Sequence, residues 1–211
     1  MICKLYILPT EKLNVKDPIF LNAMSKERLK KIERFAAVAD KKLAMAAELC
    51  LCNLALELGL PIPPVYKCGE TGKPELPVSP PYFNISHCSG YALCAVADAP
   101  VGLDAEPADR TVDDRILKRL LRAGETCPSA IWKWVEKESF VKLTGEGLLR
   151  PLASFTASAD GVFDANGKRL ARISKLDLHG LCISIASYEQ ITSTVVKILS
   201  PEHLKKLLKN I

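Results

Sequence analysis

The sequence predicts an α+β fold built from two α/β halves. The predicted elements run in the order strand, helices, strands and then helices and strands again, with the change near Pro100. The composition is that of a globular protein with a sizeable core, with 48% hydrophobic and 25% charged residues among 211. We therefore expect an N-terminal half over residues 1–100 and a C-terminal half over 101–211. No clear sequence repeat links the two halves.

The first half is expected to open with a strand that Pro9 ends. Ser25 is expected to cap a basic helix that follows this strand. A longer helix comes next, with leucines at helical spacing, and Gly59 ends it. The proline-rich residues 61–81 predict an irregular loop. The predicted strands lie at 2–8, 82–85 and 91–97, the helices at 25–35 and 40–58, and a turn at 87–90.

The second half is expected to begin with a strand and two helices, the second of which ends near Gly145 and Gly147. Strands dominate the remainder, with turns at Asp160-Gly161 and Asn166-Gly167. The predicted strands lie at 101–106, 153–159, 169–178, 181–187 and 194–199. The predicted helices lie at 109–123, 129–143 and 201–209.

The composition bounds the class of protein. The formal net charge of +5 indicates an anionic ligand or partner. The eight cysteines form no C-x-x-C pair and accompany only three histidines, which argues against zinc. Several cysteines sit in apolar runs, as buried free thiols do. No window has the roughly 20 apolar residues of a membrane span, and the N-terminus lacks a signal-peptide pattern. We therefore expect a cytoplasmic protein with reduced thiols.

Two short blocks could build an acidic pocket. Asp104 and Glu106 are two residues apart and share a face if they lie on a strand. Glu138 and Lys142 are four apart and share a face if they lie on a helix. Mg²⁺ takes one or two carboxylates together with substrate phosphates, so these faces predict a magnesium and polyphosphate site. The plainer alternatives are a solvated strand end and a helix ion pair that contributes about 0.3–0.5 kcal/mol.

A third block offers groups that bind phosphate. Ser86-His87 leads into a glycine-bearing turn, whose amides, hydroxyl and imidazole could cradle a phosphate. A histidine that only caps the turn is the alternative. Ser86 as the nucleophile of a hydrolytic triad is disfavoured, because no G-x-S-x-G is present and an adjacent histidine is poorly placed as its base. Lys73, in Gly72-Lys73-Pro74, could reach a phosphate or be a solvated loop lysine.

In order and spacing, these blocks resemble the 4′-phosphopantetheinyl transferases, in particular the larger surfactin-synthetase-activator type. The resemblance covers roughly residues 25–190. Each motif is modest alone, and the ordered set is specific. The motifs are Gly72-Lys73-Pro74, Phe83-Asn84-Ile85-Ser86-His87, Gly102-Leu103-Asp104-Ala105-Glu106, Trp134 to Lys142, and Gly145-Glu146-Gly147-Leu148.

The resemblance implies a pseudo-dimeric fold of two similar α/β halves with the active site in the cleft between them. It also implies transfer of the phosphopantetheine arm of coenzyme A to a serine of an apo carrier protein, with release of adenosine 3′,5′-bisphosphate. By position, magnesium would be bound by Asp104, Glu106 and Glu138. His87 and Lys73 would contact phosphates of coenzyme A, and Lys142 the pyrophosphate. Glu138, or a water held by the carboxylates, would take the serine proton.

The sequence departs from the family at the adenosine side. Leu43 stands where many members have an arginine that helps to hold coenzyme A. The basic helix keeps Arg28, Lys31 and Arg34, and we expect Lys31 and Arg34 to contribute to the coenzyme A site. Cys88 replaces the commoner serine after His87.

Two other function classes are open. A coenzyme A or nucleotide-binding module without catalysis would need a degenerate site, against which the intact carboxylates and Lys142 argue. A nucleic-acid-binding protein has only the basic N-terminal helices in its favour, because aromatic residues are sparse at 6%. We therefore expect neither nucleic acid nor a membrane as partner. The chain length favours a monomer, and the sequence does not choose among carrier proteins or between Mg²⁺ and Mn²⁺.

Overall fold

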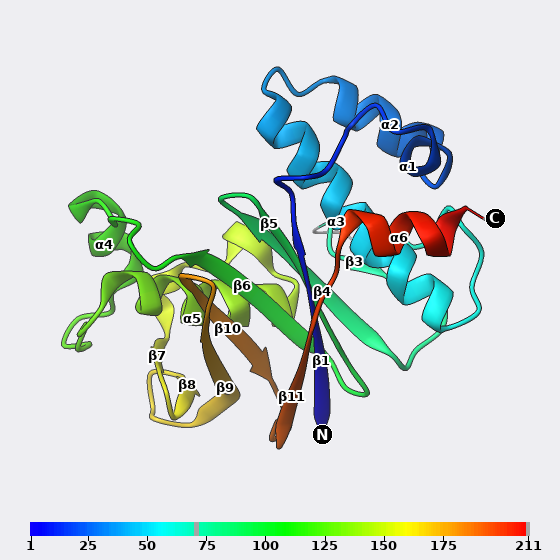
Figure 1. Cartoon of the computed structure of the whole chain (residues 1–211). Coiled ribbons are helices and arrows are strands. Elements are labelled where there is room, and N and C mark those ends of the chain that lie inside the picture. The colour runs from blue at the N-terminus through cyan, green and yellow to red at the C-terminus, as the bar shows by residue number, and fades with distance from the viewer. Residues whose placement is uncertain (70–71, 210–211) are drawn as a thin grey trace.

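A computed structural model describes residues 1–69 and 72–209, and it has a mixed α+β fold with two main sheets. The first sheet has the strand order β11-β1-β5-β4 and the second has the order β6-β10-β9-β8-β7. A small hairpin, β2-β3, accompanies them. In Figure 1, α3 and α6 lie against the first sheet and α5 lies beside β6 and β10.

The bounds of the elements agree with most of the predictions. The strands are β1 (Ile2–Pro9), β2 (Lys67–Cys68), β3 (Pro74–Glu75), β4 (Tyr82–Cys88), β5 (Tyr91–Ala97), β6 (Val101–Pro107), β7 (Thr156–Ser158), β8 (Gly161–Phe163), β9 (Arg169–Leu178), β10 (Leu181–Ser187) and β11 (Ser193–Ile198). The helices are α1 (Pro18–Asn22), α2 (Lys26–Glu33), α3 (Val38–Glu57), α4 (Asp114–Leu120), α5 (Ala130–Thr144) and α6 (Pro201–Leu208), with short 3₁₀ helices η1 (Gly147–Leu149) and η2 (Leu152–Ser154).

Several predictions of local structure were wrong in part. The strand expected over 153–159 is the 3₁₀ helix η2 followed by the shorter strand β7, and the strand β8 was not predicted. The helix α1 was not predicted, although Asp17 caps it and Pro18 occupies its first turn. The loop over 61–81 contains the hairpin β2-β3. The strand β4 continues through His87, which is therefore not in a turn. The helix α4 is shorter than predicted, because Asp113 caps it four residues later than expected.

The two sheets pack face to face, and each is covered on its outer face by a long helix. Alternate residues of β1 show this: Leu5 and Ile7 lie in the core between the sheets, whereas Tyr6 and Leu8 pack with α3. In the same way, Leu103 and Ala105 of β6 enter the inter-sheet core. The other face of β6 meets α5. The layers are therefore helix, sheet, sheet and helix.

The C-terminal segment returns to the first sheet. The strand β11 pairs in parallel with β1, and α6 buries Leu204 and Leu208 in the core beneath α3. The expected division at residue 100 and the pseudo-dimeric symmetry stay predictions. No helix of the described chain combines the length and the apolar character that crossing a membrane would require. All eight cysteines are free, and six of them are buried.

Candidate active site

A close approach between β6 and α5 places the acidic residues. Gly102 of β6 lies against the helix so tightly that a Cβ atom there would be 2.0 Å from the Ser139 carbonyl oxygen and 2.3 Å from the Leu143 nitrogen. Strand alternation puts Asp104 and Glu106 on the same face as Gly102. The side chains of Asp104 and Glu106 therefore lie on the face of β6 that packs against α5.

Three elements meet at Asp104. Lys142 Nζ, from α5, donates to Asp104 Oδ1 at 2.6 Å and to Ser86 Oγ at 3.1 Å. Ser86 Oγ, from β4, donates to the same Asp104 oxygen at 3.0 Å. Lys142 of α5 thus forms its ion pair with Asp104 of β6. The alternative, an ion pair between Lys142 and Glu138 within the helix, is not what the structure shows for Lys142.

Two carboxylate oxygens at this site are buried without a hydrogen-bond partner. They are Asp104 Oδ2 and Glu138 Oε1. The pKa of Glu138 is raised, first by burial and then by the charge of Asp104, with Lys142 opposing the shift and Glu106 adding to it. Buried polar groups in proteins are nearly always satisfied, so these two oxygens are suited to bind a further group.

These carboxylates fit a hard divalent cation. Oxygen ligands with negative charge are those that Mg²⁺ prefers, and a cation would both satisfy the two oxygens and relieve their repulsion. The fit rests on the two unsatisfied oxygens and on the electrostatic interaction between Asp104 and Glu138. Within residues 1–69 and 72–209, no three His, Cys, Asp or Glu side chains are gathered as metal ligands are.

Glu106 also lines a hollow of about 590 Å³, together with His87 and Arg110. The Glu106 carboxylate accepts a hydrogen bond from Arg110, whose guanidinium lies 5.5 Å from the centre of the Trp134 ring. His87 is exposed on this side of β4. Arg110 was not predicted, and its only signal was the spacing of four residues after Glu106. The hollow therefore offers two groups suited to an anion beside one acidic group.

Lys73 lies at the other end of the site. Its Nζ donates to the Leu143 carbonyl oxygen at 2.9 Å, and burial lowers the pKa of this lysine. Lys73, Lys142 and Asn84 line one cavity of about 230 Å³. The loop therefore delivers Lys73 to the same cavity as Lys142, as a phosphate site would require.

Asn84 is a structural residue that sequence reasoning missed. Its Oδ1 accepts a hydrogen bond from the Leu103 backbone nitrogen at 2.9 Å, and the side chain is buried. This bond joins the edge of the first sheet to the edge of the second. The asparagine in Phe83-Asn84-Ile85-Ser86-His87 was the available signal, since a buried amide needs a partner.

Comparison with known proteins identifies relatives. No protein-family model matches the chain. The 4′-phosphopantetheinyl transferase psf-1 of Bacillus pumilus is 32% identical over 65% of this chain and 66% of its own length. The transferase gsp of Aneurinibacillus migulanus is 28% identical over 63% and 60%, and Sfp of Bacillus subtilis strain 168 is 28% identical over 65% and 67%.

The chain is a relative of these 4′-phosphopantetheinyl transferases. The matched region spans only about three fifths to two thirds of the length of psf-1, gsp and Sfp. The motifs by which the sequence resembles the transferase family supply the residues that meet in the fold. Asp104 with Ser86, Lys142 with Lys73, and Glu106 with His87 each share a contact or a cavity.

Lys31 and Arg34, which we expect to contribute to the coenzyme A site, lie on α2. Lys31 and Arg34 are exposed on α2, which packs on α3 and lies away from α5 in Figure 1. No contact found for them within the described residues reaches the carboxylates. Arg28 of the same helix forms a buried ion pair with Glu48, at 2.6 Å. Lys31 and Arg34 as coenzyme A ligands thus stay a prediction.

Proposed function

We propose that this protein transfers the 4′-phosphopantetheine group of coenzyme A to a serine of an apo carrier protein. One structural observation carries the proposal. Asp104 Oδ2 and Glu138 Oε1 are buried and unsatisfied beside Lys142, at positions that match the motifs of the transferase family. The names of the related proteins support the reaction class.

The proposed reaction is a displacement at phosphorus. The serine oxygen bonds to the β-phosphorus of coenzyme A, and the bond from this phosphorus to the oxygen shared with the α-phosphate breaks. Adenosine 3′,5′-bisphosphate leaves with the electron pair of the broken bond. Glu138, which has a raised pKa and therefore a high affinity for protons, accepts the serine proton.

Other residues hold the anionic substrate. Lys142 would neutralise charge at the transferred phosphate, with Ser86 as a hydrogen-bond partner, and Lys73 would bind a phosphate from the opposite wall of their shared cavity. His87 would contact a further phosphate. Asp104, Glu106 and Glu138 would hold Mg²⁺, which when bound supplies charge stabilisation to the pyrophosphate.

The carrier protein is expected to dock through opposite charge. Lys30 and Lys31 are exposed on α2, and acidic helices are typical of carrier proteins. Reversal of charge at Lys30 alone should raise the carrier KM and leave the coenzyme A KM unchanged, whereas reversal at Lys31 should raise both. Unchanged carrier KM values in both variants would reject this docking face. We also propose a cytoplasmic monomer, and light scattering at several concentrations tests the oligomeric state.

A panel of carriers tests the function. The protein is incubated with coenzyme A, Mg²⁺ and apo carriers from fatty-acid, polyketide, nonribosomal-peptide and lysine pathways, and each carrier is weighed by mass spectrometry. A gain of one phosphopantetheine on at least one carrier is expected. Tight binding of coenzyme A with no gain on any carrier would instead favour a non-catalytic binding module.

A further inference from the structure

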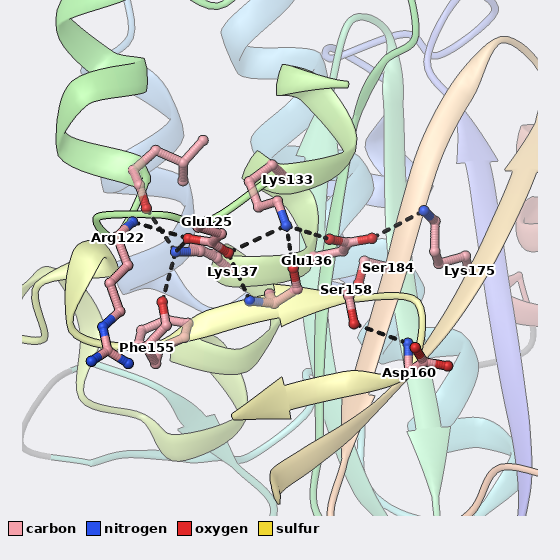
Figure 2. Close-up of polar contacts among 12 residues, drawn as sticks. Arg122, Glu125, Lys133, Glu136, Lys137, Phe155, Ser158, Asp160, Lys175 and Ser184 are labelled. Atoms are coloured by element: carbon pink, nitrogen blue, oxygen red, sulfur yellow. Dashed lines mark hydrogen bonds and ion pairs between the residues drawn. The ribbon is translucent and has the colours of Figure 1, made fainter. Parts of the chain in front are cut away.

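A buried row of alternating charges lies on the side of α5 that contacts β7 and β9. We call it the ionic row, and Figure 2 shows its side chains. Its members, in spatial order, are Lys137, Glu125, Lys133, Glu136 and Lys175. The N–O distances between neighbours are 2.6, 3.2, 3.9 and 3.0 Å. Four of its side chains are at most 6% exposed.

Lys137 is the centre of this arrangement. Its side chain is completely buried, and Nζ donates to Glu125 and to the carbonyl oxygens of Leu120, Leu152 and Phe155, at 2.6 to 2.9 Å. These partners come from the end of α4, the loop before α5, the 3₁₀ helix η2 and the residue that precedes β7. One ammonium group therefore connects these four parts of the chain to α5.

Glu125 completes the connection. Its carboxylate accepts hydrogen bonds from the backbone nitrogens of Arg122 and Ala157, at 3.0 and 2.9 Å. It also pairs with Lys133 and Lys137. Both oxygens of the Glu125 carboxylate are thus matched by donors. A buried ion pair is usually retained only where its remaining hydrogen bonds are satisfied, and this one meets that condition.

The row determines how α5 is turned about its axis. Lys137 directly precedes Glu138, and consecutive helical residues point about 100° apart, in keeping with 3.6 residues per turn. Ser139 then bonds Ser184 of β10 at 2.8 Å. Lys137 is held by four partners and Ser139 by Ser184 and the Glu136 carbonyl oxygen. Glu138 lies between them and shares a helix face with Lys142, which pairs with Asp104.

We propose that Lys137 and Glu125 are positioning residues, which hold Glu138 and Lys142 at the distance from Asp104 that cation binding and transfer require. Neither touches the carboxylates of the site, so they act through the orientation of α5. The proposal rests on the proposed function for its catalytic consequence. Its structural consequence, the affinity of the carboxylates for a divalent cation, can be measured without transfer.

The test separates positioning from stability. Lys137→Met is expected to destabilise the protein, since the buried Glu125 keeps only Lys133 of its two lysine partners and three carbonyl oxygens lose the donor that Lys137 supplies. The double variant Lys137→Met with Glu125→Gln removes both charges and should recover most of the thermal stability. We expect the double variant to bind Mn²⁺ at least fivefold more weakly, by electron paramagnetic resonance without coenzyme A. We also expect kcat to fall at least tenfold with little change in either KM. Recovery of Mn²⁺ affinity and kcat together with stability would overturn the proposal.

Two further variants keep the test decisive. Glu125→Gln alone leaves the three carbonyl bonds of Lys137 and is expected to fold, with Mn²⁺ affinity lowered about threefold, and an unchanged affinity and kcat would overturn the proposal. Glu57→Gln is the matched control, because Glu57 pairs with Lys4 and Lys197 at the first sheet, outside the ionic row. It should leave Mn²⁺ binding unchanged. A wild-type protein that binds Mn²⁺ but modifies no carrier overturns the proposed reaction alone, and one that binds no Mn²⁺ overturns both proposals.

Discussion

Glu138 and Asp104 each keep a buried oxygen that the fold leaves unsatisfied. An unsatisfied buried polar atom costs about 1–3 kcal/mol, and Lys142 offsets this cost only at the other oxygen of Asp104. A sequence optimised for stability alone would not retain this arrangement. Sites that trade stability for activity are common, and substitutions there can stabilise the protein while removing its function.

Glu138→Gln should therefore stabilise the metal-free protein. The pKa of Glu138 is raised above its ordinary 4.5, so the folded protein binds this proton more tightly than the unfolded chain does. The stability that this proton provides is lost as pH rises through the raised pKa, and glutamine, which stays neutral, avoids the loss. We expect a gain of about 1 kcal/mol, or roughly 2–4 °C in Tm, at neutral pH.

Calorimetry across pH measures this effect. The gain should vanish well below the ordinary carboxyl pKa, where Glu138 is protonated in both states. Mg²⁺ should raise the Tm of the wild type and not that of Glu138→Gln. A variant that is less stable at neutral pH and still responds to Mg²⁺ would contradict the role given to Glu138.

Lys142→Ala tests the opposite charge. Asp104 is 5% exposed and would lose the one cation that pairs with it among the described residues, so we expect a destabilisation of about 1–3 kcal/mol without metal. Because Mg²⁺ would replace part of the lost charge, it should restore stability more in this variant than in the wild type. Chemical denaturation with and without Mg²⁺ measures both. Lys197→Ala, which removes an exposed partner of Glu57, is the control and should show no such recovery.

The helix α5 was predictable in its bounds and in the stripe that carries Glu138 and Lys142, because helical spacing places residues four apart on one face. The same helical spacing predicted that Glu136 and Lys137 lie off this stripe, on another side of the helix. The sequence did not reveal what they meet there. The ionic row joins α5 to residues as far along the chain as Lys175, and such long-range pairs leave no periodic signal.

Gly102→Ala should separate α5 from β6. The new Cβ would lie 2.0 and 2.3 Å from backbone atoms of α5, which cannot move unless the helix moves. We expect a loss of about 1–3 kcal/mol and of most of the transfer activity. Gly69→Ala is the control, since its Cβ would meet only the Lys73 carbonyl oxygen, at 3.8 Å. Stability and activity close to wild type in Gly102→Ala would contradict the packing described.

Local rules explain which elements were missed. The helix α1 has one turn and a half, too short for a periodic pattern, and only Asp17-Pro18 marked it. The strand β4 was ended too early because Ser86-His87-Cys88 has no apolar alternation. Those residues pair with β5 all the same, since Cys88 faces Tyr91 across a two-residue turn at Ser89-Gly90.

At the scale of the whole molecule, the fold joins the two ends of the described chain. Cys3 lies opposite Thr194 and Ile7 opposite Ile198 in the parallel pair of β1 and β11. The sequence predicted both strands and the helix that follows the second one. It did not predict their partners, since partners so far apart along the chain depend on the complete three-dimensional packing. The site residues, by contrast, could be predicted together because the family resemblance supplied their order.

Removal of residues 193–211 tests this closure. The truncated protein would expose the edge of β1 and the core positions that Leu199, Leu204 and Leu208 fill. We expect it to lose cooperative unfolding or to aggregate, although the site residues remain in the chain. A truncated protein with a wild-type circular dichroism spectrum and Tm would show that this segment is not part of the folding unit.

We propose that Asp104 and Glu138 form one cation site that serves phosphopantetheine transfer. The most direct measurement is the mass of an apo carrier after incubation with coenzyme A, Mg²⁺ and either the wild-type protein, Asp104→Ala or Glu138→Ala. We predict the gain of one phosphopantetheine with the wild type and none with either variant, while both variants remain folded by circular dichroism. Full transfer by a folded variant, or no transfer by the wild type to any carrier of the panel, would contradict it.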